Sequence, residues 1–547
     1  GMTADDASEN AYLGYVFGHP GLDGNTQAVP AALENLTITG SNIKDYALKN
    51  CANLKTITFT QNVKSIGAGV MENCNSLSEV TLPFIGQRYD ESDEYNGIGD
   101  SARPDSSKLE YVFGKAIPES VEKLEITKAF VTETYAGYAL IGLLGSKVKE
   151  LVYTSENEII YKKLFDAFTY GTTLVIRGNV TKIDGDIFGY RSSVTDIVLP
   201  ETVTEIGDNA FASAYKLKEI SIPNVTTIGA NAFSGCSELN KIETGDNLVT
   251  IGDSAFKNCT KLSQFYTGNK LVSIGNDAFA NCTDLFRFTL PETVTSVGDG
   301  AFLNCTGILE VLNLSALSAD KGSDALGGLC KYAWDVYTSS SAQSKITDTD
   351  GYIIYKQNSG DIFIKYIGSD SSIQIPAGVK IINKSAFYDN AYIVEVVIPS
   401  GVEKIEAEAF RNCTGLQKIQ IADSVTEIDD NAFDGCTSLT LVNLPENMQK
   451  INAGLFKNCS SLTEITLPSA LTEIGDNAFN GTKIVSITIP DSVAKIGESA
   501  FENCTELTAV IISANSTLRV IGKQAFAYCR NLETITLPEG LTTIGTG

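Results

Sequence analysis

The chain has little of what most catalytic and metal sites are built from. Its 547 residues include a single histidine, His19, and a single tryptophan. One imidazole cannot form a two-histidine metal site or a histidine acid–base pair. We interpret His19, which precedes Pro20, as a turn residue and not as a member of a catalytic triad. Carboxylates are plentiful, but no spacing brings a particular pair into one cleft, as glycoside hydrolysis requires. The sequence therefore predicts a protein that is not an enzyme and has no cofactor.

Blocks of positive charge and long apolar runs are also missing. The chain has 41 Lys and Arg against 66 Asp and Glu, a formal net charge of −25. Such an acidic surface repels the phosphates of nucleic acids and the headgroups of anionic membranes. No apolar run approaches the roughly 18 residues of a membrane-spanning helix. We expect neither nucleic-acid binding nor membrane insertion.

What the sequence does contain is an internal repeat. A phenylalanine, usually in an Ala-Phe pair, returns every 22 or 23 residues, with one step of 25, in two blocks. The positions are Phe188, Phe211, Phe233, Phe256, Phe279 and Phe302, then Phe387, Phe410, Phe433, Phe456, Phe479, Phe501 and Phe526. Leu48 and Met71 keep the same spacing near the N-terminus. A unit this short cannot bury its own apolar face, so we expect neighbouring units to stack into one continuous core.

One repeat unit shows how each coil is expected to fold. Leu462–Leu467 alternates apolar and polar residues, as a half-buried strand does, and Pro468 ends that strand. After a second short apolar pair, Gly475 turns the chain. The segment Asp476–Phe479 is typical of one helical turn that places Phe479 in the core.

The glycine of this turn recurs in most units, as in Gly252, four residues before the phenylalanine. Glu406, Asp429 and Asn452 stand at the same position in other units. Because glutamate adopts a left-handed backbone poorly, we interpret the position as one that does not require positive φ.

Cysteine follows the repeat. Eleven of the twelve cysteines stand three residues after the repeat phenylalanine or its Leu48 or Met71 equivalent, and no Cys-x-x-Cys pair exists. We expect a ladder of reduced thiols in the core and no zinc site. Parallel side chains about 4.8 Å apart are poorly placed for disulfides. Cys330 alone lies outside the frame and is the candidate for unusual reactivity.

The repeat also creates Asn-Cys-Thr/Ser sequons. They begin at Asn258, Asn281, Asn304, Asn412, Asn458 and Asn503. We expect each asparagine to make a turn or helix-end hydrogen bond within its own coil. Only a eukaryotic source would make these positions glycan sites.

The consensus of these units, I-x-L-P-x-x-V-x-x-I-G-x-x-A-F-x-N-C-x-x-L, resembles the BspA-like class of leucine-rich repeats. The match is close over residues 181–305 and 376–547 and looser over 29–83. The resemblance implies a bacterial, or less often protozoan, cell-surface protein used in adhesion or in binding host or matrix proteins. It implies no catalytic residues and no shared ligand motif.

We therefore predict a leucine-rich-repeat solenoid, of the α/β repeat class but mainly β with short helical turns, whose coils of about 23 residues stack into a curved rod. The sequence divides into degenerate N-terminal repeats with insertions (1–180), regular repeats (181–305), an interruption (306–375) and regular repeats (376–547). Gly1 before Met2 is typical of tag removal, and Gly547 falls within a repeat. We expect signal or anchor segments to be missing from these ends.

Two insertions stand out from the repeat. The acidic loop 90–100 is a candidate for weak calcium binding, with plain solvation as the simpler interpretation. Within 306–375, Tyr352–Lys356 and Ile362–Tyr366 flank the turn sequence Asn358–Asp361 and predict a hairpin. We expect this hairpin to project from the stack or to widen one coil, on a face that is often the functional one.

Outward strand positions vary between coils, and a few carry the residue types that are enriched at binding hot spots. Tyr266, Phe286 and Arg287 adjoin the interruption that holds Trp334 and Tyr352. We take these five residues as the candidate ligand-binding surface, against the alternative of ordinary surface variation.

These observations predict an extracellular or cell-surface protein that binds or adheres to a host or matrix protein or a glycan. The sequence does not identify that ligand, and we expect a monomer. The alternative is a stiff structural spacer that binds nothing itself and presents another domain at the cell surface.

Overall fold

The computed structural model describes residues 32–84, 109–188 and 193–547, with short gaps at 41, at 44 and at several positions between 115 and 145. His19 and the acidic loop 90–100 lie outside the described residues. The chain forms two compact units, Gly1–Ala342 (unit 1) and Gln343–Gly547 (unit 2). The division falls inside the interruption that the sequence shows at 306–375.

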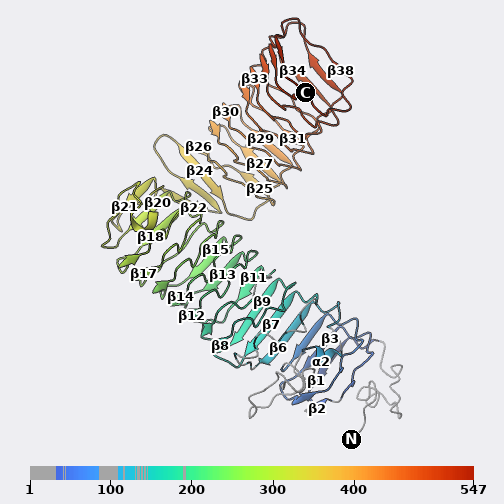
Figure 1. Cartoon of the computed structure of the whole chain (residues 1–547), viewed down its shortest axis with the longest axis vertical. Coiled ribbons are helices and arrows are strands. Elements are labelled where there is room, and N and C mark those ends of the chain that lie inside the picture. Colours follow the sequence, from blue (N-terminus) through green and yellow to red (C-terminus); the bar gives the residue numbers. More distant parts are fainter. Residues whose placement is uncertain are drawn as a thin grey trace. The chain divides into compact units, whose positions relative to one another are not determined.

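Unit 1 is a parallel β-solenoid in which most coils contribute one long and one short strand, so that two faces of parallel strands form (Figure 1). We call them the long-strand face and the short-strand face. The long-strand face contains β1 (Asn35–Ile38), β3 (Thr56–Phe59), β5 (Glu79–Leu82), β6 (Lys123–Ala129), β7 (Glu150–Ser155), β9 (Thr173–Gly178), β11 (Asp196–Val198), β13 (Glu219–Ile222), β15 (Lys241–Thr244), and then β18 (Arg287–Leu290), β20 (Glu310–Asn313) and β21 (Asp335–Tyr337). The short-strand face contains β2 (Asn42–Ile43), β4 (Ser65–Ile66), β8 (Ile159–Ile160), β10 (Lys182–Ile183), β12 (Glu205–Ile206), β14 (Thr227–Ile228), β16 (Thr250–Ile251), β17 (Ser273–Ile274) and β19 (Ser296–Val297).

Unit 2 repeats this architecture. Its long-strand face contains β25 (Ser372–Gln374), β27 (Glu395–Ile398), β29 (Lys418–Ile421) and β31 (Leu441–Val442), then β34 (Ser486–Ile489), β36 (Ala509–Ile512) and β38 (Thr534–Ile535). Its short-strand face contains β26 (Val379–Ile382), β28 (Lys404–Ile405), β30 (Glu427–Ile428), β32 (Lys450–Ile451), β33 (Glu473–Ile474), β35 (Lys495–Ile496), β37 (Val520–Ile521) and β39 (Thr543–Ile544). The helices in the described residues are short, and among them are α2 (Leu109–Phe113) and α4 (Ala325–Gly328), the latter with non-helical backbone angles inside.

The predicted hairpin is confirmed. β23 (Tyr352–Tyr355) pairs antiparallel with β24 (Asp361–Tyr366), and β22 (Ile346–Thr349) pairs antiparallel with the other edge of β23. β24 also pairs in parallel with β26, and the Phe363 ring lies 5.0 Å from that of Phe387 in a stacked geometry. The hairpin therefore does not project freely: its second strand is the first rung of the unit 2 stack.

The repeat phenylalanines fill the interior as predicted. Phe211, Phe233 and Phe256 belong to one continuous core cluster, and each ring lies 5.2 Å from the next in a stacked geometry. Unit 2 has its own cluster, in which the ring of Phe433 stacks on those of Phe410 and Phe456 at 5.3 and 5.5 Å. Within a unit, each ring therefore covers the next. The core is divided into two clusters, one in each unit, so the prediction of one continuous core is correct within each unit and wrong for the chain as a whole.

The predicted helical turn around each phenylalanine is wrong. Asn209 and Ser213, two residues before and after Phe211, have positive φ, which an α-helix does not allow. The N–H groups of Asn209, Phe211 and Ser213 donate to carbonyls of the next coil at 2.7–2.8 Å, while the intervening Ala210 and Ala212 bond back within their own turn. Every second backbone N–H group thus bonds to the next coil, whereas in a helix all of these groups would bond along the axis of the helix itself.

The interpretation of the recurring glycine is confirmed. Gly252 does not have positive φ; a side chain is excluded because a Cβ atom there would lie 2.6 Å from the backbone N of Ala230 and from the carbonyl carbon of Gly229 in the preceding coil. The N–H of Gly252 donates to the carbonyl of Ile228 at 2.8 Å. Where the sequence has Asn452 at this position, its side-chain amide donates to the carbonyl of Ile428 at 2.7 Å instead. Glycine is favoured at this position because neighbouring coils approach closely, and not because the backbone requires a positive φ.

We expect Phe433→Ala to lower the free energy of unfolding of the protein by about 3–5 kcal/mol, because it removes a ring that is stacked on both sides and leaves a cavity. Leu441→Ala is the control, since this aliphatic side chain is 53% exposed and its loss is expected to cost less than about 1 kcal/mol. Urea unfolding followed by circular dichroism measures both. Equal losses in the two variants would contradict the stacked core.

Candidate binding surface

Metal-binding clusters are not found in the described residues: no group of three or more His, Cys, Asp or Glu side chains is placed to hold an ion. Within the same residues, no helix has the length and hydropathy needed to cross a membrane.

The cysteines lie in the core, as their spacing predicts. All twelve are free, and eleven are buried while Cys529 is half-buried. From Cys74 onward, each repeat thiol donates to the carbonyl of the repeat residue in the preceding coil, for example from Cys259 Sγ to the oxygen of Phe233 at 3.1 Å. Burial raises the pKa of Cys236 to about 12, so this thiol remains protonated at neutral pH.

The predicted special reactivity of Cys330 is wrong. This thiol is fully buried, and burial, with a smaller contribution from the charge of Asp320, raises its pKa. A reactive cysteine must be accessible to solvent and readily deprotonated, and Cys330 meets neither condition.

The prediction for the sequon asparagines is confirmed for backbone groups and wrong for side chains. The carbonyls of Asn412, Asn458 and Asn503 accept turn hydrogen bonds within their own coil at 2.8–2.9 Å. The side-chain amide of Asn281 donates to Oδ1 of Asn258 at 2.7 Å, and that of Asn304 donates to Oδ1 of Asn281 at 3.0 Å. Because the same residue recurs at the same place in successive coils, the nearest acceptor for an asparagine is its counterpart in the neighbouring coil. The result is a ladder of amides along the outside of the turns.

Tyr266 is the most exposed member of the predicted ligand-binding surface. Its side chain is 57% exposed, and its hydroxyl donates to Oδ1 of Asp246 at 2.6 Å, which raises the pKa of Tyr266. No strand forms at 263–267, where the long-strand face of unit 1 is broken. At this break, the hydroxyls of Thr244 and Thr267 donate to the carbonyls of Tyr266 and Thr289.

Arg287 begins β18, in the coil next to that of Tyr266. One guanidinium nitrogen donates to Oε1 of Gln264 at 3.2 Å, and the guanidinium carbon lies 5.5 Å from the centre of the Phe286 ring. Phe286 itself is 2% exposed. The sequence-based placement of Phe286 on the exposed surface is therefore wrong, because adjacent side chains of an extended segment point to opposite faces and Arg287 occupies the outer one. Phe286 supports Arg287 and does not face solvent.

The other two predicted residues contribute differently. Trp334 is half-buried in unit 1, where its backbone N–H donates to the carbonyl of Leu309 at 2.8 Å beside β21. Tyr352 lies in unit 2, where its half-buried ring packs 5.2 Å from Tyr366 and 6.0 Å from Phe363; burial raises its pKa. Of the five residues, Tyr266 and Arg287 are thus the pair that adjacent coils place together on an outer face.

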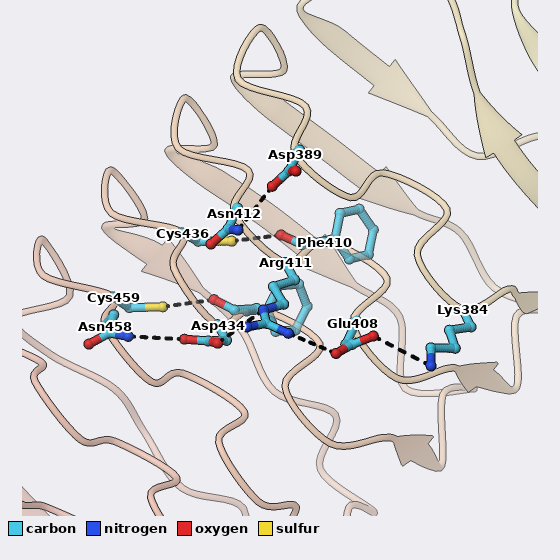
Figure 2. A network of polar contacts seen from close by, with 11 residues as sticks. Lys384, Asp389, Glu408, Phe410, Arg411, Asn412, Asp434, Cys436, Asn458 and Cys459 are labelled. Atoms are coloured by element: carbon cyan, nitrogen blue, oxygen red, sulfur yellow. Dashed lines mark hydrogen bonds and ion pairs between the residues drawn. The ribbon is translucent and has the colours of Figure 1, made fainter. Parts of the chain in front are cut away.

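A polar network in unit 2 was missed by sequence reasoning. Figure 2 shows Arg411 between two carboxylates, with one terminal nitrogen 2.8 Å from Glu408 Oε1 and Nε 3.3 Å from Oδ2 of the buried Asp434. The guanidinium also lies 6.0 Å from the centre of the Tyr388 ring. The available signal was the repeat itself: Tyr388, Arg411 and Asp434 each follow a repeat phenylalanine directly, so they occupy one position in three successive coils.

We expect a thiol reagent to modify at most Cys529 in the folded protein at neutral pH, because the other cysteines are buried and desolvation disfavours thiolates. Full denaturation in urea should expose all twelve cysteines. Mass spectrometry after iodoacetamide treatment identifies the modified positions. Rapid modification of Cys330 in the folded protein would contradict this assignment.

Several solved structures of leucine-rich-repeat proteins are similar to this chain, whereas no curated protein matches it. A T. pallidum leucine rich repeat protein is 29% identical over 34% of this chain and 90% of that chain, with a TM-score of 0.32. A leucine rich cell surface protein from Faecalibacterium prausnitzii A2-165 is 23% identical over 71% of this chain and 83% of its own, with a TM-score of 0.30. A leucine-rich repeat protein from Bacteroides ovatus is 26% identical over 60% of this chain and 81% of its own, also with a TM-score of 0.30.

The family comparison covers most of the sequence. The model of the BspA type leucine rich repeat region matches residues 31–95, 143–239, 204–319, 361–469 and 437–547. These segments include the stacked phenylalanines, the glycine turns and the cysteine ladder of both units. The chain belongs to the BspA-type leucine-rich-repeat family.

Proposed function

We propose that this chain is an extracellular or cell-surface adhesion protein that binds a host or matrix protein or a glycan through the long-strand face of unit 1. Tyr266 and Arg287 are the centre of the proposed contact. The proposal is supported by the family and by one structural observation: an exposed tyrosine stands where the regular ladder of this face is interrupted. Leucine-rich-repeat solenoids typically act as binding scaffolds, and the proposed role is binding without catalysis.

Both central side chains are held before any ligand arrives. Asp246 fixes the hydroxyl end of the Tyr266 ring, and Gln264 and Phe286 fix the Arg287 guanidinium. Side chains that are already ordered lose less conformational entropy on binding. Tyrosine and arginine are also the residue types that most often dominate an interface.

Charge restricts the proposed ligand. The net charge of −25 disfavours strongly anionic ligands over most of the surface. Near Tyr266, Lys241 is paired with Glu243 at 2.7 Å, and Lys270 donates to Oδ1 of Asn247 at 2.9 Å. The proposed ligand is therefore a protein or glycan surface that is not strongly anionic.

We expect Tyr266→Ala and Arg287→Ala each to weaken the binding of the protein to its ligand by about tenfold, because each removes an ordered contact from the centre of the interface. The measurement is biolayer interferometry against an array of immobilised matrix proteins and glycans, followed by titration of any ligand that binds.

Tyr170→Ala is the matched control, since Tyr170 is a tyrosine of unit 1 that is 66% exposed but lies in a different coil. The proposed centre would be contradicted if Tyr266→Ala and Tyr170→Ala weakened binding equally, or if neither variant changed it. A chain that binds nothing on the array would favour the structural-spacer function.

A further inference from the structure

One coil of unit 2 exposes more apolar surface than the coils beside it. Tyr388 is 40% exposed, Tyr392 is 70% exposed and Val394 is 37% exposed, all within residues 387–398. At the same positions of the following coil stand Arg411, Gly415 and Gln417, because Glu395 pairs with Lys418 in the parallel ladder. On the preceding side, Ile367 is 39% exposed and directly follows Tyr366, whose N–H bonds to the carbonyl of Ala386.

One side of the Tyr392 ring is uncovered because the backbone of the next coil leaves no room for a side chain beside it. Its counterpart in the following coil is Gly415. A Cβ atom at Gly415 would lie 2.2 Å from the carbonyl oxygen of Ala391, so close packing of the two coils allows no side chain there. Nothing on Gly415 can cover the Tyr392 ring, and its high exposure follows from this.

The ring of Tyr388 already makes a cation–π contact within its own chain. The guanidinium of Arg411 lies 6.0 Å from the ring centre, and Glu408 and Asp434 hold it there through ion pairs of 2.8 and 3.3 Å. Lys384 approaches Glu408 at 3.5 Å on the other side (Figure 2). The positive charges of Arg411 and Lys384 are therefore compensated, and this part of the surface does not attract anions.

Two carboxylates near these tyrosines are not compensated. Asp389 accepts a hydrogen bond from the amide of Asn412 at 2.9 Å, and Asp370 uses its backbone N–H to bond the Tyr366 hydroxyl at 2.8 Å. No Lys or Arg of the described residues forms an ion pair with either carboxylate. Asp370 stands beside this coil, because the carbonyl of the adjacent Ser371 accepts the N–H of Val394 at 2.7 Å.

We propose that Tyr388, Tyr392 and Val394, with Ile367, Asp370 and Asp389, form a second binding surface, which accepts a segment of a partner protein that carries lysine or arginine side chains. Exposed tyrosine faces beside uncompensated carboxylates suit such cations, through cation–π and charge interactions together. The aliphatic side chains of Ile367 and Val394 suit the methylene stems of the same residues. This surface lies in unit 2 and is independent of the contact proposed around Tyr266.

The test is a titration of the whole protein, at about 0.15 M salt, with a soluble peptide of alternating lysine and serine and with a second peptide that has glutamate in place of lysine. We expect saturable binding of the lysine peptide alone. Tyr392→Ala and Tyr388→Ala are each expected to weaken it about fivefold, the effect of losing one cation–π contact. The double variant Asp370→Asn/Asp389→Asn is expected to weaken it by a similar factor. The Asp389→Asn change keeps a side-chain carbonyl oxygen at this position. The amide of Asn412 can therefore still donate its hydrogen bond there, and the ladder between the coils is preserved.

Matched controls separate this surface from the general acidity of the chain. Tyr170→Ala removes a tyrosine of unit 1 that is 66% exposed, close to the 70% of Tyr392, and Glu446→Gln/Glu506→Gln removes two exposed carboxylates from later coils of unit 2. Neither control should change the affinity by more than about twofold. Equal weakening by test and control variants would overturn the proposal in favour of diffuse attraction. Binding of a neutral glycan in place of the lysine peptide, or a change only in self-association measured by sedimentation, would overturn it as well. Tyr266→Ala should leave the peptide titration unchanged, so this outcome is independent of the function proposed for unit 1.

Discussion

Each coil of this solenoid satisfies its buried groups through the neighbouring coil. The N–H of Phe410 donates to the carbonyl of Ala432 at 2.8 Å, and the carbonyl of Phe410 accepts the thiol of Cys436 at 3.1 Å. The rings stack between the same coils. A buried backbone group without a partner costs as much as a lost hydrogen bond, so a single coil would be unstable, and a run of coils becomes stable only as a stack. This dependence accounts for the strict spacing of the interior residues.

The same constraint leaves the outer positions free to vary. Ring, thiol and glycine positions are fixed by distances of a few ångströms to the next coil, whereas an outward strand residue meets mainly solvent and its two lateral neighbours. Several of these neighbours are oppositely charged and paired, as in Lys418 with Glu395 at 2.6 Å and Lys123 with Glu150 at 2.7 Å. Exposed pairs of this kind contribute little stability. Binding surfaces can therefore change from coil to coil without disturbing the core, and the exposed tyrosines at 266, 388 and 392 are departures of this kind.

Sequence periodicity was sufficient for the core but not for the conformation of the turns. The spacing of the phenylalanines predicted the shared core, the thiol positions and the tolerance of Glu406 at a glycine position. The spacing did not predict that successive backbone N–H groups of the turn bond alternately to their own coil and to the next coil. This pattern replaces the expected helical turn, and it depends on the position of the adjacent backbone. Phe165 lies 23 residues before Phe188 and packs near it at 6.2 Å, yet the weak consensus around it places it among the degenerate repeats. For the candidate surface, residue type indicated Tyr266 and Arg287 but misplaced Phe286, since a type preference does not specify which face a side chain occupies.

Hydrogen exchange at the phenylalanine amides tests the dependence of one coil on the next most directly. The N–H of Phe433 donates to the carbonyl of Leu455 in the next coil at 3.1 Å, whereas the N–H of the exposed Asn447 has no acceptor among the described residues. Exchange measured by mass spectrometry on peptides that cover the two sites should show strong protection of Phe433, similar to that of strand residues, and weak protection of Asn447. Equal exchange at the two amides would contradict the account, because it would mean that the next coil does not hold the amide of Phe433.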